Sequence, residues 1–497
     1  MNLKRFFKYS IFLIGIMISS GACKDYLDIN QDPNAVLDAP IEQVYTSATV
    51  SVGFFAGSDL NRYSSLIAQQ WSGTLPNQTG EYERYNISGT DVNNAWNLVY
   101  STALSDLELV IQKAVAENSP NYAGPAKILK AYLFQLLVDT WGNIPFSEAL
   151  KFTEITAPKF DDASTIYPAL ISLLDQAIAD INATSVKSPA ANGSIFTGSW
   201  ASQKPKWERL ANTLKMRLFL HYSKIDKAKA VAEIGKLTSA NVMTSNTDNF
   251  QMAFFATSGQ QNPIHQFEVN RGNYLFANAT IVNMMNSKSD PRRPKYFTAF
   301  PLYSGKYVGS PSANLQSNIK FSRLFTFLRG DTTNTAPIVP AADGSISATQ
   351  YPYNGTAPIR MLTFAEYNFI RAEAAVLGVP GIAADSFYRS GIRASMAMAG
   401  VTTAATDAYI GANPFPDAGT DAEKIKAIIE EKYVANFGVV VEPWTDFRRT
   451  GYPALVIPSN ALFPATPRSL FFPQSEIDRN PNAKQKADPS EKIFWDK

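Results

Sequence analysis

Helical periodicity is the feature that most constrains the fold of this 497-residue chain. Apolar residues recur three or four positions apart along several long segments, which is the spacing of a helix that buries one face. This pattern predicts a mostly α-helical protein. The clearest segments are 104–114, 128–137, 161–181, 206–222 and 363–378.

Short breaks rich in Gly, Pro and Asn separate neighbouring helical segments, at 118–125 and 141–145. Helices joined by such short breaks pack against each other, and large apolar residues on one helix here meet alanines on the next. The pattern favours tetratricopeptide-like helix pairs, although the chain has no strict repeat period.

The periodicity fades between residues 240 and 358, where Ser, Asn, Gly, Pro, Tyr and Phe are frequent. This composition predicts long loops with short strands. A long irregular segment inside a helical protein usually carries function. We therefore expect this segment to contribute to a functional site.

The N-terminus has the features of a secretory signal peptide over residues 1–22. Basic residues precede an apolar stretch at 11–18 that is too short to span a bilayer, and small residues then lead to Cys23. Cys23 is the only cysteine, so it cannot form an internal disulfide, and its position indicates lipidation after cleavage behind Ala22. Because Ser20 stands where lipoprotein signals usually have an aliphatic residue, a plain signal peptide is the alternative.

Composition excludes several classes of function. Lys and Arg total 45 against 43 Asp and Glu, and this balance argues against a nucleic-acid-binding surface. With two histidines and no cysteine after Cys23, a Cys/His zinc site is nearly excluded, and we expect no metal or cofactor. No hydrolase, nucleotide-binding or metalloprotease motif is present, so no catalytic residue is predicted. No linker divides the chain, which predicts a single domain over 23–497.

A series of segments after Cys23 resembles, in order, the motifs of the SusD/RagB family, and more narrowly SusD-like family 2. The segments are 25–34, 123–150, 207–218, 289–297, 361–378, 431–453 and 466–480. The last segment, 466–480, lacks the doubled Arg that the family often has there.

This resemblance implies a mostly α protein, with tetratricopeptide-like helix pairs on one side and an irregular, ligand-carrying side. It implies a lipid-anchored outer-membrane protein of Bacteroidota that is exposed at the cell surface and binds oligosaccharides without being an enzyme. The implied partner is a SusC-like TonB-dependent transporter, and we expect segments 103–150 and 206–222 to form the face that contacts it. The alternatives are a peptide-binding protein of the same transport architecture and, more distantly, a hydrolase that uses loop carboxylates.

Aromatic residues among polar ones mark two candidate ligand sites. Tyr and Trp offer a flat apolar face with a polar edge, which suits a sugar ring. The polar segment 69–89 contains Trp71, Tyr82 and Tyr85, and these rings either bind the ligand or pin the loop to the body. The second set lies in the loop-rich segment. It consists of Tyr274, Phe276, Tyr303 and Tyr307.

Several charged residues are expected to stabilise the fold rather than to act on a ligand. Glu366 and Glu373 lie seven positions apart on one predicted helix, where they could form an acid pair. We expect them instead to pair with arginines of neighbouring elements, because the planar Arg side chain suits buried carboxylate pairing. The same structural role is expected of Asp290, Arg292, Trp444, Asp446, Arg448 and Arg449.

Overall fold

The computed structural model describes residues 39–151, 154–191, 193–312, 314, 319–333, 338–342, 344, 346, 352–381 and 383–497. The chain divides into two units, residues 1–43 and 44–497, and the second is considered below. The predicted signal peptide at 1–22, the lipidation site Cys23 and the motif at 25–34 lie outside the described residues.

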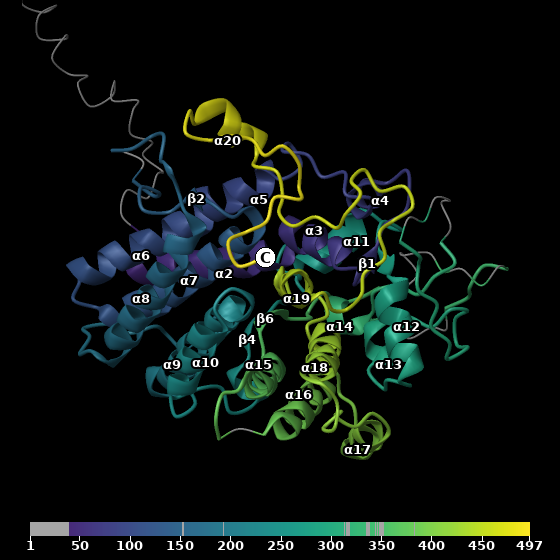
Figure 1. Ribbon diagram of the computed structural model, residues 1–497. Helices are drawn as coiled ribbons and strands as arrows, with labels where there is room; N and C mark the ends of the chain where they lie inside the picture. The colour runs from purple at the N-terminus through teal and green to yellow at the C-terminus, as the bar shows by residue number, and fades with distance from the viewer. Residues whose placement is uncertain are drawn as a thin grey trace, which may run out of the picture. The chain divides into compact units, whose positions relative to one another are not determined.

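Helices form most of the regular structure, which confirms the predicted mostly α fold (Figure 1). The first half of the chain contains α2 (Ile41–Gly57), α3 (Asp59–Ile67), α4 (Gln78–Glu83), α5 (Asn93–Asn97), the π-helix η1 (Leu98–Leu104), α6 (Ser105–Ala116), α7 (Pro120–Trp141), α8 (Ala163–Asn182), α9 (Trp200–His221), the 3-10 helix η2 (Tyr222–Lys224), α10 (Lys227–Leu237) and the 3-10 helix η3 (Asn246–Asp248). The second half contains α11 (Pro263–Asn270), α12 (Ala279–Ser287), α13 (Arg293–Tyr296), α14 (Thr326–Arg329), α15 (Phe364–Leu377), α16 (Ala384–Met398), α17 (Thr403–Ala412), α18 (Asp421–Ala435), α19 (Glu442–Thr450) and α20 (Gln474–Arg479). The strands are β1 (Trp71–Ser72), β2 (Ile144–Pro145), β3 (Phe160–Asp161), β4 (Phe250–Met252), β5 (Phe276–Ala277) and β6 (Ile359–Leu362).

Helices that follow one another in the chain pack against each other. α6 contacts α7, α7 contacts α8, α8 contacts α9, and α9 contacts α10 (Figure 1). A second group follows later in the chain, where α15 contacts α16 and α18. This arrangement confirms the predicted tetratricopeptide-like helix pairs. None of the helices that the structure describes is both long and apolar enough to cross a membrane.

The boundaries of α7 correct one prediction and confirm another. The expected break at 118–125 is wrong, because α7 already begins at Pro120. Proline has no backbone N–H, but the first residues of a helix have no hydrogen-bond partner for that group, so the helix can start there. Gly124 lets α7 approach α8 closely, since a Cβ at this position would lie 2.8 Å from the Ala177 carbonyl oxygen. The helix ends at Trp141 before Gly142, so the expected break at 141–145 is present.

The described residues between 240 and 358 are largely irregular, as predicted. Its short strands pair with distant segments: β4 with β6, and β5 with β1, where Ala277 lies opposite Trp71. No helical pattern in the sequence marks α11 and α12, because their eight and nine residues are too few to show a helical period. Both begin with an asparagine cap, because the side chains of Asn262 and Asn278 accept hydrogen bonds from the first turn.

A network of buried ion pairs joins α9, α15, α18 and α19. Arg217 on α9 donates two hydrogen bonds of 2.8 Å to the carboxylate of Glu366 on α15. Lys432 on α18 lies 2.8 Å from both Glu442 and Asp446 on α19. Each of these side chains is at most 3% exposed, so every charge depends on its partners for the solvation that water would supply.

The remaining charged motif residues also bond within the protein. Arg449 donates 2.8 Å hydrogen bonds to Glu373 and to Asp446, which confirms the predicted pairing of Glu373 with an arginine. The Arg448 guanidinium lies 3.8 Å from the ring centroid of the buried Trp444. These contacts confirm the expected structural role of the motif in α19.

A second buried cluster surrounds Glu431 on α18. Its carboxylate accepts hydrogen bonds from Lys288 at 2.9 Å, Arg292 at 2.9 Å and the Tyr409 hydroxyl at 2.7 Å. Arg292 also pairs with Asp290, as predicted. Burial alone would raise the pKa of Glu431, but the two cations lower it to about 2.

We expect Glu431 to make stability dependent on acid pH. Its pKa in the folded protein lies below the unfolded value of 4.5, so its contribution is present above pH 4.5 and is lost as the pH falls toward about 2. The shift corresponds to about 3 kcal/mol of unfolding free energy. Urea unfolding of the wild type and Glu431→Gln should show a large difference at pH 7 that shrinks below pH 4.5. The surface variant Glu233→Gln, which loses a pair with the exposed Lys236, should show little difference at any pH. A difference for Glu431→Gln that does not change with pH would contradict the expectation.

Candidate functional site

The first set of candidate aromatic residues is buried. Trp71 has no exposed surface, and Tyr82 and Tyr85 are 3% and 2% exposed. The expectation that these rings present a stacking surface is therefore wrong for this conformation. The rings pin the segment 69–89 to the body, which is the alternative that the sequence left open.

The contacts of these three rings explain their burial. Trp71 lies in β1, which pairs with β5 from far along the chain. The Tyr82 ring meets Tyr63 edge-on at 4.9 Å, and its hydroxyl donates to Asp91 at 3.0 Å. The Tyr85 hydroxyl lies 3.3 Å from that of Thr466, almost 400 positions later.

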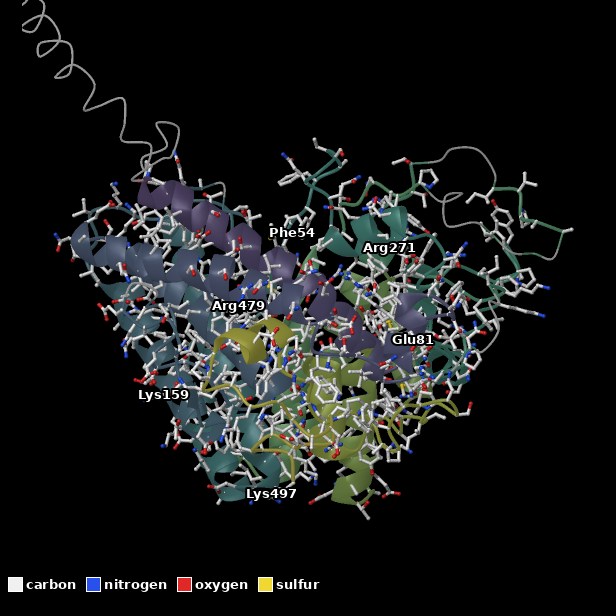
Figure 2. All side chains as sticks on the ribbon, turned by 90° about the horizontal axis from the view of Figure 1, so that it is seen from above. Phe54, Glu81, Lys159, Arg271, Arg479 and Lys497 are labelled. Atoms are coloured by element: carbon white, nitrogen blue, oxygen red, sulfur yellow. The ribbon has the colours of Figure 1, made fainter. Side chains whose placement is uncertain are left out.

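The second set divides between two places. Tyr303 and Tyr307 line one pocket, together with residues from neighbouring loops. Phe276 is buried in β5. Tyr274 is half-buried and lies outside the pocket, with its ring centroid 5.8 Å from the guanidinium of Arg271, which Figure 2 labels.

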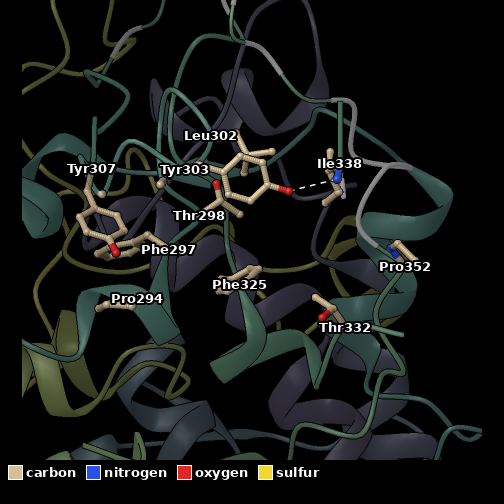
Figure 3. Close-up of a pocket in the computed structure, with 12 residues that line it drawn as sticks. Pro294, Phe297, Thr298, Leu302, Tyr303, Tyr307, Phe325, Thr332, Ile338 and Pro352 are labelled. Carbon is tan, nitrogen blue, oxygen red and sulfur yellow. Dashed lines mark hydrogen bonds between the residues drawn. The ribbon is translucent and has the colours of Figure 1, made fainter. Parts of the chain in front are cut away.

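The pocket has a volume of about 460 Å³ and lies in the loop-rich segment (Figure 3). It opens between the turn that carries Tyr303 and the segments around α13 and α14. Its walls are mostly aromatic and aliphatic, with two threonine hydroxyls. The lining residues are Pro294, Phe297, Thr298, Ala299, Leu302, Tyr303, Gly305, Tyr307, Phe325, Thr332, Ile338 and Pro352.

Tyr303 is held in place although it is exposed. Its side chain is 70% exposed, and its backbone has φ of 63°, a left-handed conformation that costs free energy for a residue with a Cβ. The turn is closed by backbone bonds from Ser304 to Pro301 and from Phe300 to Lys306. At the tip of the Tyr303 side chain, the hydroxyl accepts a 3.0 Å hydrogen bond from the Ile338 N–H, which Figure 3 shows as a dashed line.

The floor of the pocket is built on buried rings. Phe297 is 1% exposed, and its ring centroid lies 5.5 Å from that of Phe437. Leu302, Phe325 and Ile338 pack on a small separate cluster formed by Ile346 and Tyr353. Backbone bonds between 296–298 and 323–325 hold the two floor segments together.

Tyr307 forms one wall. Its ring centroid lies 5.5 Å from the guanidinium of Arg293 and 6.5 Å from the centroid of Phe297. Burial raises the pKa of Tyr307, so its hydroxyl stays protonated at neutral pH and can donate or accept a hydrogen bond.

The chemistry of the pocket favours binding over reaction. Flat rings contact apolar C–H faces, and the hydroxyls of Thr298, Thr332 and Tyr307 can bond to a polar edge. No acidic, basic or histidine side chain is among the described residues that line it. The spacing of Glu366 and Glu373 could have suggested an acid pair. Their carboxylates instead accept hydrogen bonds from Arg217 and Arg449, respectively. Within the described part of the chain, no group of His, Cys, Asp or Glu side chains could hold a metal ion.

The sequence family described as starch-binding associating with outer membrane, SusD-like family 2, matches residues 33–473. This chain belongs to the SusD-like family. The family assignment confirms the resemblance seen in the motifs, and it covers the helical segments as well as the loop-rich segment that carries the pocket. No curated protein matches this SusD-like chain.

Solved structures share the fold of this SusD-like protein. A chitin-binding SusD homologue from Flavobacterium johnsoniae is 20% identical, with 92% of this chain and 98% of that chain covered and a TM-score of 0.73. A SusD/RagB family protein from Bacteroides thetaiotaomicron is 20% identical over 92% and 99%, with a TM-score of 0.75. A SusD homologue from Bacteroides uniformis is 22% identical over 91% and 99%, with a TM-score of 0.71.

We expect Trp71→Ala to lower stability rather than to act on ligand binding directly. Removing a fully buried Trp side chain costs about 3–5 kcal/mol of unfolding free energy, whereas an exposed substitution such as Tyr303→Ala changes it by about 0.5 kcal/mol or less. Urea unfolding of both variants tests this difference. Wild-type stability in Trp71→Ala would show that the ring does not pin the segment.

Proposed function

We propose that this SusD-like protein binds an extended oligosaccharide in the pocket beneath Tyr303 and delivers it to a SusC-like TonB-dependent transporter. The observation that carries the proposal is Tyr303 itself. Its ring is exposed, is fixed by a turn and a hydrogen bond, and borders a floor of buried rings. A ring that is already ordered loses little conformational entropy when a ligand stacks on it.

The lining favours a saccharide over a peptide. A sugar offers an apolar face to Tyr303 and Phe325 and hydroxyl groups to Thr298 and Thr332. A peptide of mixed charge would find no opposite charge among the described lining residues. Two similar structures bear names that describe them as chitin-binding, and this supports a glycan ligand class for the present chain.

In this role the protein would lie at the cell surface, anchored in the outer membrane. Residues 1–22 would be removed as a signal peptide and Cys23 acylated, which leaves a single mature domain over 23–497. The family description, which includes association with the outer membrane, supports this location.

The transporter would contact the helical face within 103–150 and 206–222. α7 is buried along nearly its whole length, so α6 supplies much of the accessible surface in the first of these segments. α6 carries two exposed apolar side chains, Leu109 at 41% and Val115 at 74% exposure, which a partner could cover.

Tyr303→Ala should weaken ligand binding by roughly tenfold or more. Stacking on one aromatic ring contributes about 1–3 kcal/mol by analogy with nucleic-acid bases, and about 1.4 kcal/mol corresponds to a factor of ten. A glycan array and a peptide library would identify the ligand, and calorimetry would then compare the variants. Tyr303→Phe should retain most of the affinity because it keeps the ring, and Tyr274→Ala should retain all of it because Tyr274 lies outside the pocket. Unchanged affinity in a folded Tyr303→Ala variant would move the site elsewhere, and ligands found only in the peptide library would replace the saccharide with a peptide.

Cys23→Ser should release the protein from the outer-membrane fraction, because the acyl chains would be lost. In mild detergent, the wild type at native expression should co-purify with a large TonB-dependent barrel. Membrane retention of Cys23→Ser, together with no acyl chains on the wild type by mass spectrometry, would contradict lipidation. Recovery of the wild type without a barrel would contradict the partnership.

A further inference from the structure

A second pocket, of about 290 Å³, adjoins the pocket beneath Tyr303. Consecutive residues divide between the two: Pro294, Phe325 and Thr332 line the first, and their neighbours Lys295, Thr326 and Asp331 line the second. The two pockets therefore meet across α13, α14 and the residues that follow α14. The segments that the two pockets share bring the pockets close together.

Arg360 gives the second pocket its distinctive chemistry. It comes from β6 and is 9% exposed, with its guanidinium 3.7 Å from the ring centroid of Phe327. One of its terminal nitrogens donates a 3.0 Å hydrogen bond to the Phe327 carbonyl oxygen, and its Nε has no hydrogen-bond partner. Within the described part of the chain, no carboxylate forms an ion pair with it.

Arg448 shows what a fully satisfied arginine looks like in the same protein. Its guanidinium also lies on an aromatic ring and also forms no ion pair within the described residues, but all three of its nitrogens donate hydrogen bonds, to Trp444, Arg468 and Thr445. Arg360 makes one such bond. Its Nε is buried, so an anion in the pocket would meet the other terminal nitrogen, which makes no hydrogen bond within the described residues.

Burial lowers the pKa of Arg360 to about 10. This value is still well above neutral pH, so the group keeps its charge although it lacks most of its hydration. A buried charge without a partner is destabilising, and an anion that enters the pocket would offset this cost. Lys295 is exposed at the same pocket and adds positive charge, and Thr326 and Thr356 add hydroxyls. Asp331 is the one acidic residue among the described lining residues, and it is exposed.

We propose that this second pocket binds the acidic group of the ligand, so that the oligosaccharide that stacks on Tyr303 carries a carboxylate or sulfate on a neighbouring sugar. Arg360 holds the anion from inside the pocket and Lys295 from its rim. This inference rests on the proposed glycan-binding function and narrows the ligand class to acidic oligosaccharides, such as those that contain uronic acid or sulfated sugars.

Sulfate is the first probe, with chloride at equal ionic strength as the reference. Sulfate should raise the melting temperature of the wild type by more than it raises that of Arg360→Gln or Lys295→Gln. The general salting effect of sulfate is shared by all variants and therefore cancels in this comparison. Arg389→Gln and Lys236→Gln remove the same charges from exposed helix positions and should behave like the wild type. An equal response in the wild type and Arg360→Gln would overturn the proposal.

Asp331→Asn gives a test in the opposite direction. Removing this negative charge should tighten sulfate binding, an outcome that damage to the fold would not produce. Lys295→Gln keeps the result interpretable if Arg360→Gln proves unstable, because Lys295 is exposed. Weaker sulfate binding by a folded Asp331→Asn variant would count against an anion site.

The glycan array supplies the final comparison. Glycans that bind should carry acidic groups, and Arg360→Gln should weaken them by at least about tenfold, the loss expected for one charge-assisted hydrogen bond. If only neutral glycans bind, and Tyr303→Ala but not Arg360→Gln weakens them, the proposed function stands and the acidic-ligand inference fails. Binding of peptides through a free terminal carboxylate at Arg360 would overturn the saccharide assignment.

Discussion

Buried ion pairs constrain how α9, α15, α18 and α19 pack against one another. A charge removed from water is stabilised only when its partners are correctly placed, so such a network tolerates few other arrangements of the helices that carry it. Arg217 and Glu366 connect the run of helices in the first half of the chain to the group in the second half. Lys432 ties α19 to α18, and Arg449 ties it to Glu373 on α15.

This packed base allows the proposed ligand site to be built from irregular backbone. The floor of the aromatic pocket rests on Phe297, which packs against Phe437 just after α18. Above that floor, turns and single hydrogen bonds are sufficient to order Tyr303. The proposed function thus lies on loops that a well-packed scaffold positions, as is common in binding proteins.

The sequence predicted those features that depend on local spacing. Helical periodicity identified α8, α9 and α15. The chemistry of Arg and Glu predicted that Glu366 and Glu373 would each pair with an arginine. Burial of the rings in 69–89 was not predictable, because the partners of Trp71 and Tyr85 lie about 200 and 380 positions away along the chain. No local signal distinguished Tyr303 from Tyr274. Nor did any mark Arg360, whose contact with Phe327 forms only when β6 meets α14.

The small cluster of Ile346 and Tyr353 that supports Leu302, Phe325 and Ile338 is separate from the ion-pair network. Substitutions in the pocket walls therefore act on a few local contacts and leave the packing of the long helices intact. Such a division would let side chains in the pocket walls change during evolution while the scaffold is retained. It offers a physical reason why chains only about one-fifth identical to this one keep the same fold.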